Sequence, residues 1–141
     1  MEQQQRYTLH KSEKLKSTKA IEQLFKEGKS FSAFPFRVLY LEAPSSGLEL
    51  KPNLQTAFSV SKKHFKKATN RNRIKRLMRE AWRLQKESLE NNVQKDVSKN
   101  LNVFIIYTGN ELPEYKLVFE KTTAIIKRLI KICNETGVTN T

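Results

Sequence analysis

The segment that most constrains the fold is LNVFIIYT, residues 101–108, which is rich in β-branched side chains and apolar at nearly every position. Such a run is typical of a strand in the middle of a sheet, buried on both faces. The chain must therefore supply neighbouring strands on both sides and helices to cover the sheet. Its 141 residues are enough for one compact domain with a core of its own.

Two further segments have strand patterns. FRVLYLE (36–42) alternates large apolar side chains on one side with Arg37 and leucines on the other. QTAFSVSK (55–62) is the second strand. The segment between them, 43–53, contains Pro and Gly and predicts a loop, with room for an extra short strand near 48–51.

Three helices complete the expected order. The first is capped by Ser17 or Thr18 and ends at Gly28. The second covers 70–91, and the third covers 115–133, which carries one apolar face. The order α-β-β(-β)-α-β-α predicts a single-domain α+β sandwich, with helices packed on a mainly antiparallel sheet.

The two ends of the chain lack a periodic pattern. Residues 1–15 predict a flexible basic N-terminal arm and 134–141 a disordered tail, which leaves one domain at 16–133. No apolar run approaches the length of a membrane span, and the N-terminus lacks the apolar centre of a signal peptide. Cys133 is the only cysteine, which excludes an intramolecular disulfide. We therefore expect a cytoplasmic protein without a membrane partner.

The charge of the chain points to a polyanion. Twenty-seven Lys and Arg against 14 Asp and Glu give a net charge of +13. Self-repulsion of this size disfavours a compact monomer, so a polyanionic partner is the simplest explanation. The segment from Lys62 to Lys86 contains 11 Lys or Arg and one acid, Glu80, and so carries +10 of that charge. The alternative is a basic protein whose charge only prevents aggregation.

Helix 70–91 separates apolar from cationic side chains when its residues are placed about 100° apart. The stripe expected to face the core is Ile74, Leu77, Met78, Ala81, Trp82 and Leu89. The cationic strip is Lys75, Arg76, Arg79, Arg83 and Lys86. Glu80 and Glu87 fall outside the strip, whereas a helix that needed only solubility would interleave opposite charges.

This strip has the length and chemistry of a phosphate-binding surface. It extends roughly 16–18 Å along the helix, enough to follow several phosphates of a nucleic acid. Forked guanidinium groups suit phosphate oxygens. Asn72 lies beside the strip, while Arg71 and Arg73 lie off it, at the start of the helix. We interpret the strip as a nucleic-acid surface, and a merely solvated helix face is the alternative.

The chain does not have the residue patterns of a protein catalyst. It contains no Gly-rich phosphate loop and no Cys/His set at metal-ligand spacing. Neither His10 nor His64 has a partnered nucleophile, and the acids are scattered. We therefore expect no catalytic residue and no metal ligand in this chain.

Four motifs together resemble the protein subunit of bacterial ribonuclease P. They are LF (24–25), VLY (38–40), SVSKK (59–63) and RNRIKRLMRE (71–80). The resemblance covers about residues 14–133, and the RNR-x-KR-x-x-R run after an SKK strand end is its most specific part.

The resemblance implies an activity that belongs to a ribonucleoprotein. In that family a large catalytic RNA removes the 5′ leader from precursor tRNA, an endoribonuclease reaction assisted by magnesium ions that the RNA mainly holds. The small basic protein binds both the catalytic RNA and the leader, and is expected to be inactive alone. The resemblance also implies a left-handed β-α-β crossover, against the usual handedness.

The resemblance assigns two groups of site residues. The catalytic-RNA-binding group comprises Arg71, Asn72, Arg73, Lys75, Arg76 and Arg79, to which the helical strip adds Arg83. The leader-binding cleft, between the first helix and the sheet, comprises Phe25, Tyr40, Ser59, Ser61, Lys62 and Lys63. Bases can stack on such aromatic rings while lysines follow the phosphates. The alternative for Phe25 and Tyr40 is an ordinary core position.

The chain departs from the family pattern at two places. Ile21 occupies a first-helix position that is commonly aromatic, and the Lys-rich 64–70 loop lacks a glycine and is a residue longer. Two other functions use a similar basic helix. A ribosomal-type RNA-binding protein would not need an aromatic cleft. A DNA-binding protein would need a short helix and turn before the basic helix, where this chain has a strand and a loop. We therefore expect neither DNA binding nor a protein oligomer.

Overall fold

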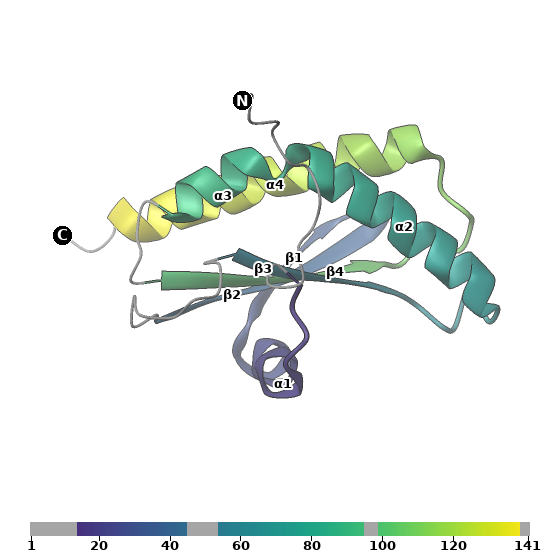
Figure 1. Ribbon diagram of the computed structural model, residues 1–141, viewed down its shortest axis with the longest axis horizontal. Helices are drawn as coiled ribbons and strands as arrows, with labels where there is room; N and C mark the ends of the chain where they lie inside the picture. The colour runs from purple at the N-terminus through teal and green to yellow at the C-terminus, as the bar shows by residue number, and fades with distance from the viewer. Residues whose placement is uncertain (1–13, 45–53, 95–98, 139–141) are drawn as a thin grey trace, which may run out of the picture.

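The computed structural model of the protein describes residues 14–44, 54–94 and 99–138. Within these ranges four strands form one sheet in the order β1-β2-β4-β3. Helices α2, α3 and α4 cover one face of this sheet, and α1 lies on the other (Figure 1). The elements are α1 (Thr18–Glu27), β1 (Lys29–Ala33), β2 (Phe36–Pro44), β3 (Leu54–Val60), α2 (Ala68–Gln85), α3 (Glu87–Gln94), β4 (Lys99–Tyr107) and α4 (Tyr115–Val138).

The sheet is mainly antiparallel, as predicted. Strand β2 pairs antiparallel with both β1 and β4, whereas β3 pairs parallel with β4. Strand β4 therefore lies between two neighbours, which confirms the mid-sheet position predicted for LNVFIIYT. Because β3 and β4 run in the same direction, α2 and α3 form the crossover between them. The left-handed sense expected for this crossover stays a prediction.

The extra strand is β1, which the sequence pattern did not predict. Its segment, KSFSA, places a single large apolar residue, Phe31, between exposed serines. A short edge strand of this kind carries little periodic signal. It forms a hairpin with β2 through Phe34 and Pro35. The region near 48–51 lies outside the described residues.

The main core lies between the sheet and the three helices above it. Ile74, Met78, Ala81 and Trp82 of α2 are buried there, which confirms the apolar stripe predicted for this helix. Phe36 and Val38 of β2 and the alternate residues of β4 face them from the sheet. The basic side of α2 therefore faces away from this core.

A second, smaller core lies under α1. Leu15, Leu24 and Leu39 are its buried members. Ser17 caps α1, as predicted, by accepting a hydrogen bond of 3.3 Å from the Ala20 N–H. The boundary expected at residue 15 is wrong, because Leu15 is buried and its N–H donates to the Thr56 carbonyl at 3.0 Å. The rest of the N-terminal arm lies outside the described residues.

Two helix boundaries also differ from the sequence prediction. The basic helix predicted at 70–91 is divided into α2 and α3 at Lys86. The change at this residue keeps Leu89 and Val93 of α3 in the core. Helix α4 continues to Val138, so residues 134–138, predicted as part of a disordered tail, are helical.

Trp82 tests how far folding depends on the apolar side of α2. Its side chain is 1% exposed and packs edge-on against Phe58, with the ring centroids 6.1 Å apart. We expect Trp82→Ala to lower the free energy of unfolding by about 3–5 kcal/mol, because the substitution leaves a large cavity. The measurement is urea unfolding followed by circular dichroism.

Leu84 provides the matched control on the same helix. Its side chain is 40% exposed, so we expect Leu84→Ala to change stability by less than about 0.5 kcal/mol. Similar losses in both variants would contradict this account of the core.

Candidate nucleic-acid interface

The predicted catalytic-RNA group does not form one uniform surface. Asn72, Arg73, Arg76 and Arg79 are exposed on α2, and Lys75 is half-buried beside them. Arg76 and Arg79 lie three residues apart and so project from the same side of the helix. Arg76 and Arg79 are therefore the exposed members of the cationic strip, and Asn72 and Arg73 are exposed one turn before them.

Arg71 has a structural role. Its Nη1 donates to the carbonyl of Phe65 at 2.7 Å and to the carbonyl of Lys66 at 2.8 Å. These bonds fasten the start of α2 to the basic loop between β3 and α2, where the Phe65 side chain is buried. The loop is therefore held in place by an arginine that the sequence assigned to RNA.

Arg83 and Lys86, at the far end of the predicted strip, are both paired with acids. Arg83 forms a forked ion pair with Glu80 that includes a bond of 3.1 Å from Nε to Oε2. The hydrogen bond that Arg83 donates to the Glu80 carboxylate raises the pKa of the Arg83 guanidinium above its ordinary value. Lys86 is only 5% exposed, and its Nζ lies 3.4 Å from Oε2 of Glu90. Lys86 therefore does not belong to the exposed strip, and Glu80 is closer to it than the helical projection indicated.

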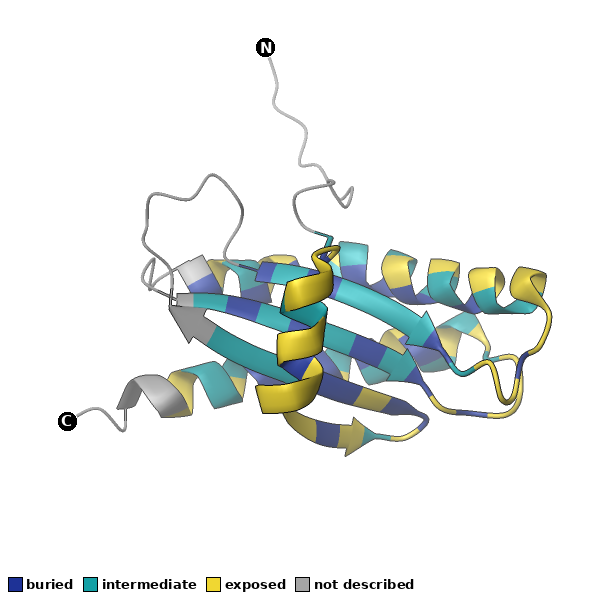
Figure 2. Cartoon of the chain, turned by 90° about the horizontal axis from the view of Figure 1, so that it is seen from below, coloured by how far each residue is buried: buried dark blue, intermediate teal, exposed yellow. Residues whose placement is uncertain are grey.

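The sheet presents a partly open face on the side of α1. Figure 2 shows α1 lying across the strands, with the sheet visible on both sides of the helix. Leu41, Ala57, Phe104 and Ile106 pack beneath or beside α1, yet they are only partly buried. Ser59 belongs to the same face, because residues two apart in a strand share a side and Ala57 lies there. We call this surface the open sheet face.

Phe25 and Phe104 form an aromatic pair at the edge of α1. Their ring centroids are 5.2 Å apart with an angle of 64° between the ring planes, and Phe25 is 54% exposed. The sequence analysis did not identify Phe104, because the apolar run 101–108 indicated burial on both faces. That expectation is wrong for the side under α1, where Phe104 and Ile106 are half-buried. The available signal was Asn102, a polar residue that strand alternation places on the same side of β4 as Phe104 and Ile106.

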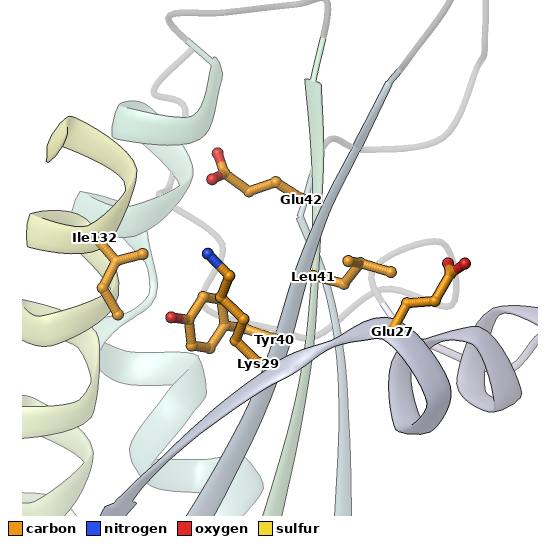
Figure 3. Close-up of a pocket in the computed structure, with 6 residues that line it drawn as sticks. All are labelled: Glu27, Lys29, Tyr40, Leu41, Glu42 and Ile132. Atoms are coloured by element: carbon orange, nitrogen blue, oxygen red, sulfur yellow. The ribbon is translucent and has the colours of Figure 1, made fainter. Parts of the chain in front are cut away.

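Tyr40 lies on the opposite face of the sheet from Phe25. It packs against the main core, with its ring centroid 5.9 Å from that of Phe31. It also lines a hollow of about 200 Å³, together with Lys29, Glu42 and Ile132 on this side of β2. Figure 3 shows the Tyr40 ring between β2 and Ile132 of α4, while Leu41 and Glu27 lie on the other side of the strand. The structure therefore does not bring Phe25 and Tyr40 into one cleft.

Burial raises the pKa of the Tyr40 phenol above its ordinary value, and the nearby Arg128 guanidinium opposes this rise. Arg128 itself lies 4.5 Å above the ring of Phe31. Tyr40 is thus a neutral, partly buried member of the layer between β2 and α4.

The end of β3 carries the remaining predicted leader residues. Ser61 follows the strand, and its N–H donates to the Tyr107 carbonyl at 3.4 Å, while its Oγ accepts from the Lys63 N–H at 3.3 Å. Lys62 and Lys63 are exposed. This serine therefore fixes a turn that displays two lysines beside the open sheet face. Ile21 of α1, at the position that is commonly aromatic in the family, is partly buried against the small core of Leu15, Leu24 and Leu39.

The described ranges contain neither a metal-binding cluster nor a membrane-spanning helix. No group of three His, Cys, Asp or Glu side chains gathers there with a geometry that could hold a metal ion. None of the helices in those ranges has the length and apolar composition needed to cross a membrane.

Arg71 can be tested for its structural role in the absence of RNA. Removing a charged hydrogen-bond donor lowers the free energy of unfolding by about 1.5–3 kcal/mol. We expect Arg71→Ala to lose about that much free energy of unfolding. Arg73→Ala, which removes an exposed arginine two residues away, should lose less than about 0.5 kcal/mol. Urea unfolding of both proteins without RNA is the measurement, and equal stabilities would remove the anchoring role.

Comparison with known proteins agrees with this geometry. The sequence model of the Ribonuclease P family matches residues 9–131. The ribonuclease P protein component of Porphyromonas gingivalis strain W83 is 36% identical over 126 residues, which cover 89% of this chain and 87% of that protein. The corresponding protein of Chlorobium phaeobacteroides is 30% identical over 128 residues, covering 86% and 88%.

Solved structures show the same fold. The ribonuclease P protein of Thermotoga maritima superposes with a TM-score of 0.58 at 27% identity, covering 82% of this chain and 96% of that one. The Staphylococcus aureus protein gives the same TM-score at 20% identity, covering 82% and 94%. With its exposed arginine strip on α2 and its SVSKK strand end, the chain therefore belongs to the ribonuclease P protein family, whose members are subunits of the ribonuclease that acts on tRNA precursors.

Proposed function

We propose that this chain holds two RNA segments on two different surfaces. The exposed part of the α2 strip binds the catalytic RNA, and the open sheet face binds the 5′ leader of precursor tRNA. The observation that carries this proposal is the separation of the two surfaces. Helix α2, which carries the strip, lies above the sheet and α1 lies below it (Figure 1), and Phe25 of α1 contacts Phe104 on that lower side. The Lys62–Lys63 turn connects β3, which belongs to the sheet, to α2, which carries the strip.

The α2 surface has the chemistry of backbone binding. Arg73, Arg76 and Arg79 are exposed, and guanidinium groups form forked bonds with phosphate oxygens. The helix below them is held by its buried apolar side, so the positions of these arginines are set before RNA binds. Such contacts fix the position of an RNA but read little of its sequence.

The open sheet face has the chemistry of single-strand binding. Phe25 presents a half-exposed ring, and base stacking on such a ring contributes about 1–3 kcal/mol without strong sequence preference. Ser59 offers a hydroxyl on the same face of the sheet, and Lys62 and Lys63 supply positive charge just after the end of β3. Tyr40 is not part of this surface, because it faces α4.

We assign the chemical step to the RNA subunit. Magnesium ions supply charge stabilisation in phosphodiester hydrolysis, and we propose that the catalytic RNA holds most of them. The protein's own side chains bind and orient the RNA. Because tRNA precursors are processed where they are transcribed in bacteria, we place this function in the cytoplasm.

The first functional prediction concerns the α2 strip. Arg76→Ala combined with Arg79→Ala should weaken assembly with ribonuclease P RNA and flatten the log–log dependence of affinity on salt. The slope should fall by about one unit for each phosphate contact removed. Filter binding at several salt concentrations gives both quantities. The matched control is Lys127→Ala with Lys131→Ala, which removes two exposed charges from α4. An identical slope in the two double variants would contradict the assignment.

The second functional prediction concerns the leader. In the reconstituted holoenzyme, Phe25→Ala should weaken binding of a precursor that has a leader by about 5- to 150-fold, the equivalent of one stacked base. Binding of mature tRNA should be unchanged. Tyr40→Phe should behave as wild type towards both RNAs, because Tyr40 lies on the other face of the sheet.

The control for Phe25 is a second exposed phenylalanine. Phe119 lies on α4, on the far side of the sheet, and is 36% exposed. Phe119→Ala should leave leader binding intact. If Phe25→Ala lost equal affinity for precursor and mature tRNA, the open sheet face would not be the leader site.

A further inference from the structure

A row of side chains crosses the whole sheet on its open face. Ser59 of β3 is paired with Ile106 of β4, Ile106 with Arg37 of β2, and Arg37 with Ser32 of β1. All four belong to the α1 side, because they alternate with residues that face the main core. With strands about 4.8 Å apart, this row spans about 14 Å. It connects the lysine turn after β3 to the opposite edge of the sheet.

The β1 end of this row is open and positively charged. Ser32 and Arg37 are exposed, whereas Ile106 and Ser59 are half-buried near α1. A guanidinium on a surface of hydroxyl and apolar groups is a suitable partner for a single phosphate. Arg37 was noted in the sequence only as part of the strand alternation.

An exposed aromatic residue lies in the hairpin turn, three residues before this arginine. Phe34, at the turn of the β1–β2 hairpin, is 74% exposed, the largest value among the large hydrophobic side chains of the described ranges. The hairpin is firmly held, because the N–H and the hydroxyl of Thr108 both donate to the Pro35 carbonyl, at 2.8 Å and 3.0 Å. The ring is thus displayed on a fixed base, which lowers the entropic cost of binding a partner.

We propose that the RNA leader continues along this row to the β1–β2 hairpin, where Arg37 binds a backbone phosphate and Phe34 stacks on a base. The proposal rests on the leader-binding function proposed above. The leader begins at the β3 side, because α2 packs on β3 and carries the strip assigned to the catalytic RNA. Arg37 and Phe34 therefore contact nucleotides far from the cleavage point.

The test uses the holoenzyme reconstituted with ribonuclease P RNA and precursors whose leaders increase from about 2 to about 10 nucleotides. Arg37→Ala should bind short leaders like wild type. It should bind the long leaders about fivefold more weakly, with a salt slope lower by about 0.7, the value for one phosphate of a single strand. Phe34→Ala should also lose about fivefold or more, again only with long leaders.

Two further variants control for charge and for folding. Lys127→Ala removes one exposed charge from α4 and should bind leaders of every length like wild type. Arg37→Gln keeps a long polar side chain in the strand and should show the same length-dependent loss as Arg37→Ala. Thermal unfolding of each variant, recorded in parallel, identifies any loss that comes from the fold.

The outcomes separate this proposal from the one on which it rests. If Phe25→Ala weakens leader binding while Arg37→Ala and Phe34→Ala match wild type at every length, the leader site stands and the path to the hairpin is overturned. If none of the three variants binds precursors more weakly than wild type relative to mature tRNA, both proposals fail. A loss in Arg37→Ala that is equal for mature tRNA and for long leaders would also overturn the path.

Discussion

The parallel pairing of β3 with β4 is the constraint on which the rest of the structure depends. Parallel neighbours cannot be joined by a tight turn, so the chain must leave the end of β3, cross the sheet and return. That crossing is made by α2 and α3, whose apolar side is drawn to the sheet. The charged side of α2 is then necessarily turned outward. One pairing thus fixes that the lysine turn lies between β3 and α2 and that the arginine strip lies on the outer side of the crossover.

The same arrangement reduces the mutual repulsion of the many cationic side chains. Charges on the outward side of α2 remain in water, where mutual repulsion is screened. At the end of α2, Arg83 and Lys86 have carboxylates nearby, Glu80 for Arg83 and Glu90 for Lys86. Arg71, at the start of the helix, donates to two backbone carbonyls. These three cations have partners within the protein, whereas Arg73, Arg76 and Arg79 are exposed to a polyanion. The arginines that look alike in the sequence therefore differ in function.

The sequence predicted the elements that have strong periodicity. The buried stripe through Ile74 and Trp82, the cap at Ser17 and the central position of β4 all follow from spacing and propensity. The short edge strand β1 did not, because five residues with one large apolar side chain hold almost no pattern. The division at Lys86 was also missed, since a helical projection assumes a straight axis while packing of Leu89 and Val93 changes it.

The site was harder to predict than the fold for a different reason. Strand alternation places Tyr40 with Phe36 and Val38, but only the position of α1 shows which side is the open one. The family motif therefore grouped Tyr40 with Phe25 across a sheet that separates them. The structural role of Arg71 could not be predicted from the sequence either. Its partners are the backbone carbonyls of Phe65 and Lys66, and every residue has a backbone carbonyl, so the residue types give no sign of these bonds.

The hydrogen bond from the Leu15 N–H to the Thr56 carbonyl lies at one edge of the sheet, along β3. Lys14 and Leu15 pair with the outer side of β3, so part of that edge is already occupied by the chain itself. At the opposite edge, β1 is five residues long and begins with a lysine. Short edge strands and edge lysines both discourage pairing with another chain. Both edges of the sheet are thus protected against pairing with a second molecule, which would extend the sheet from one copy into the next.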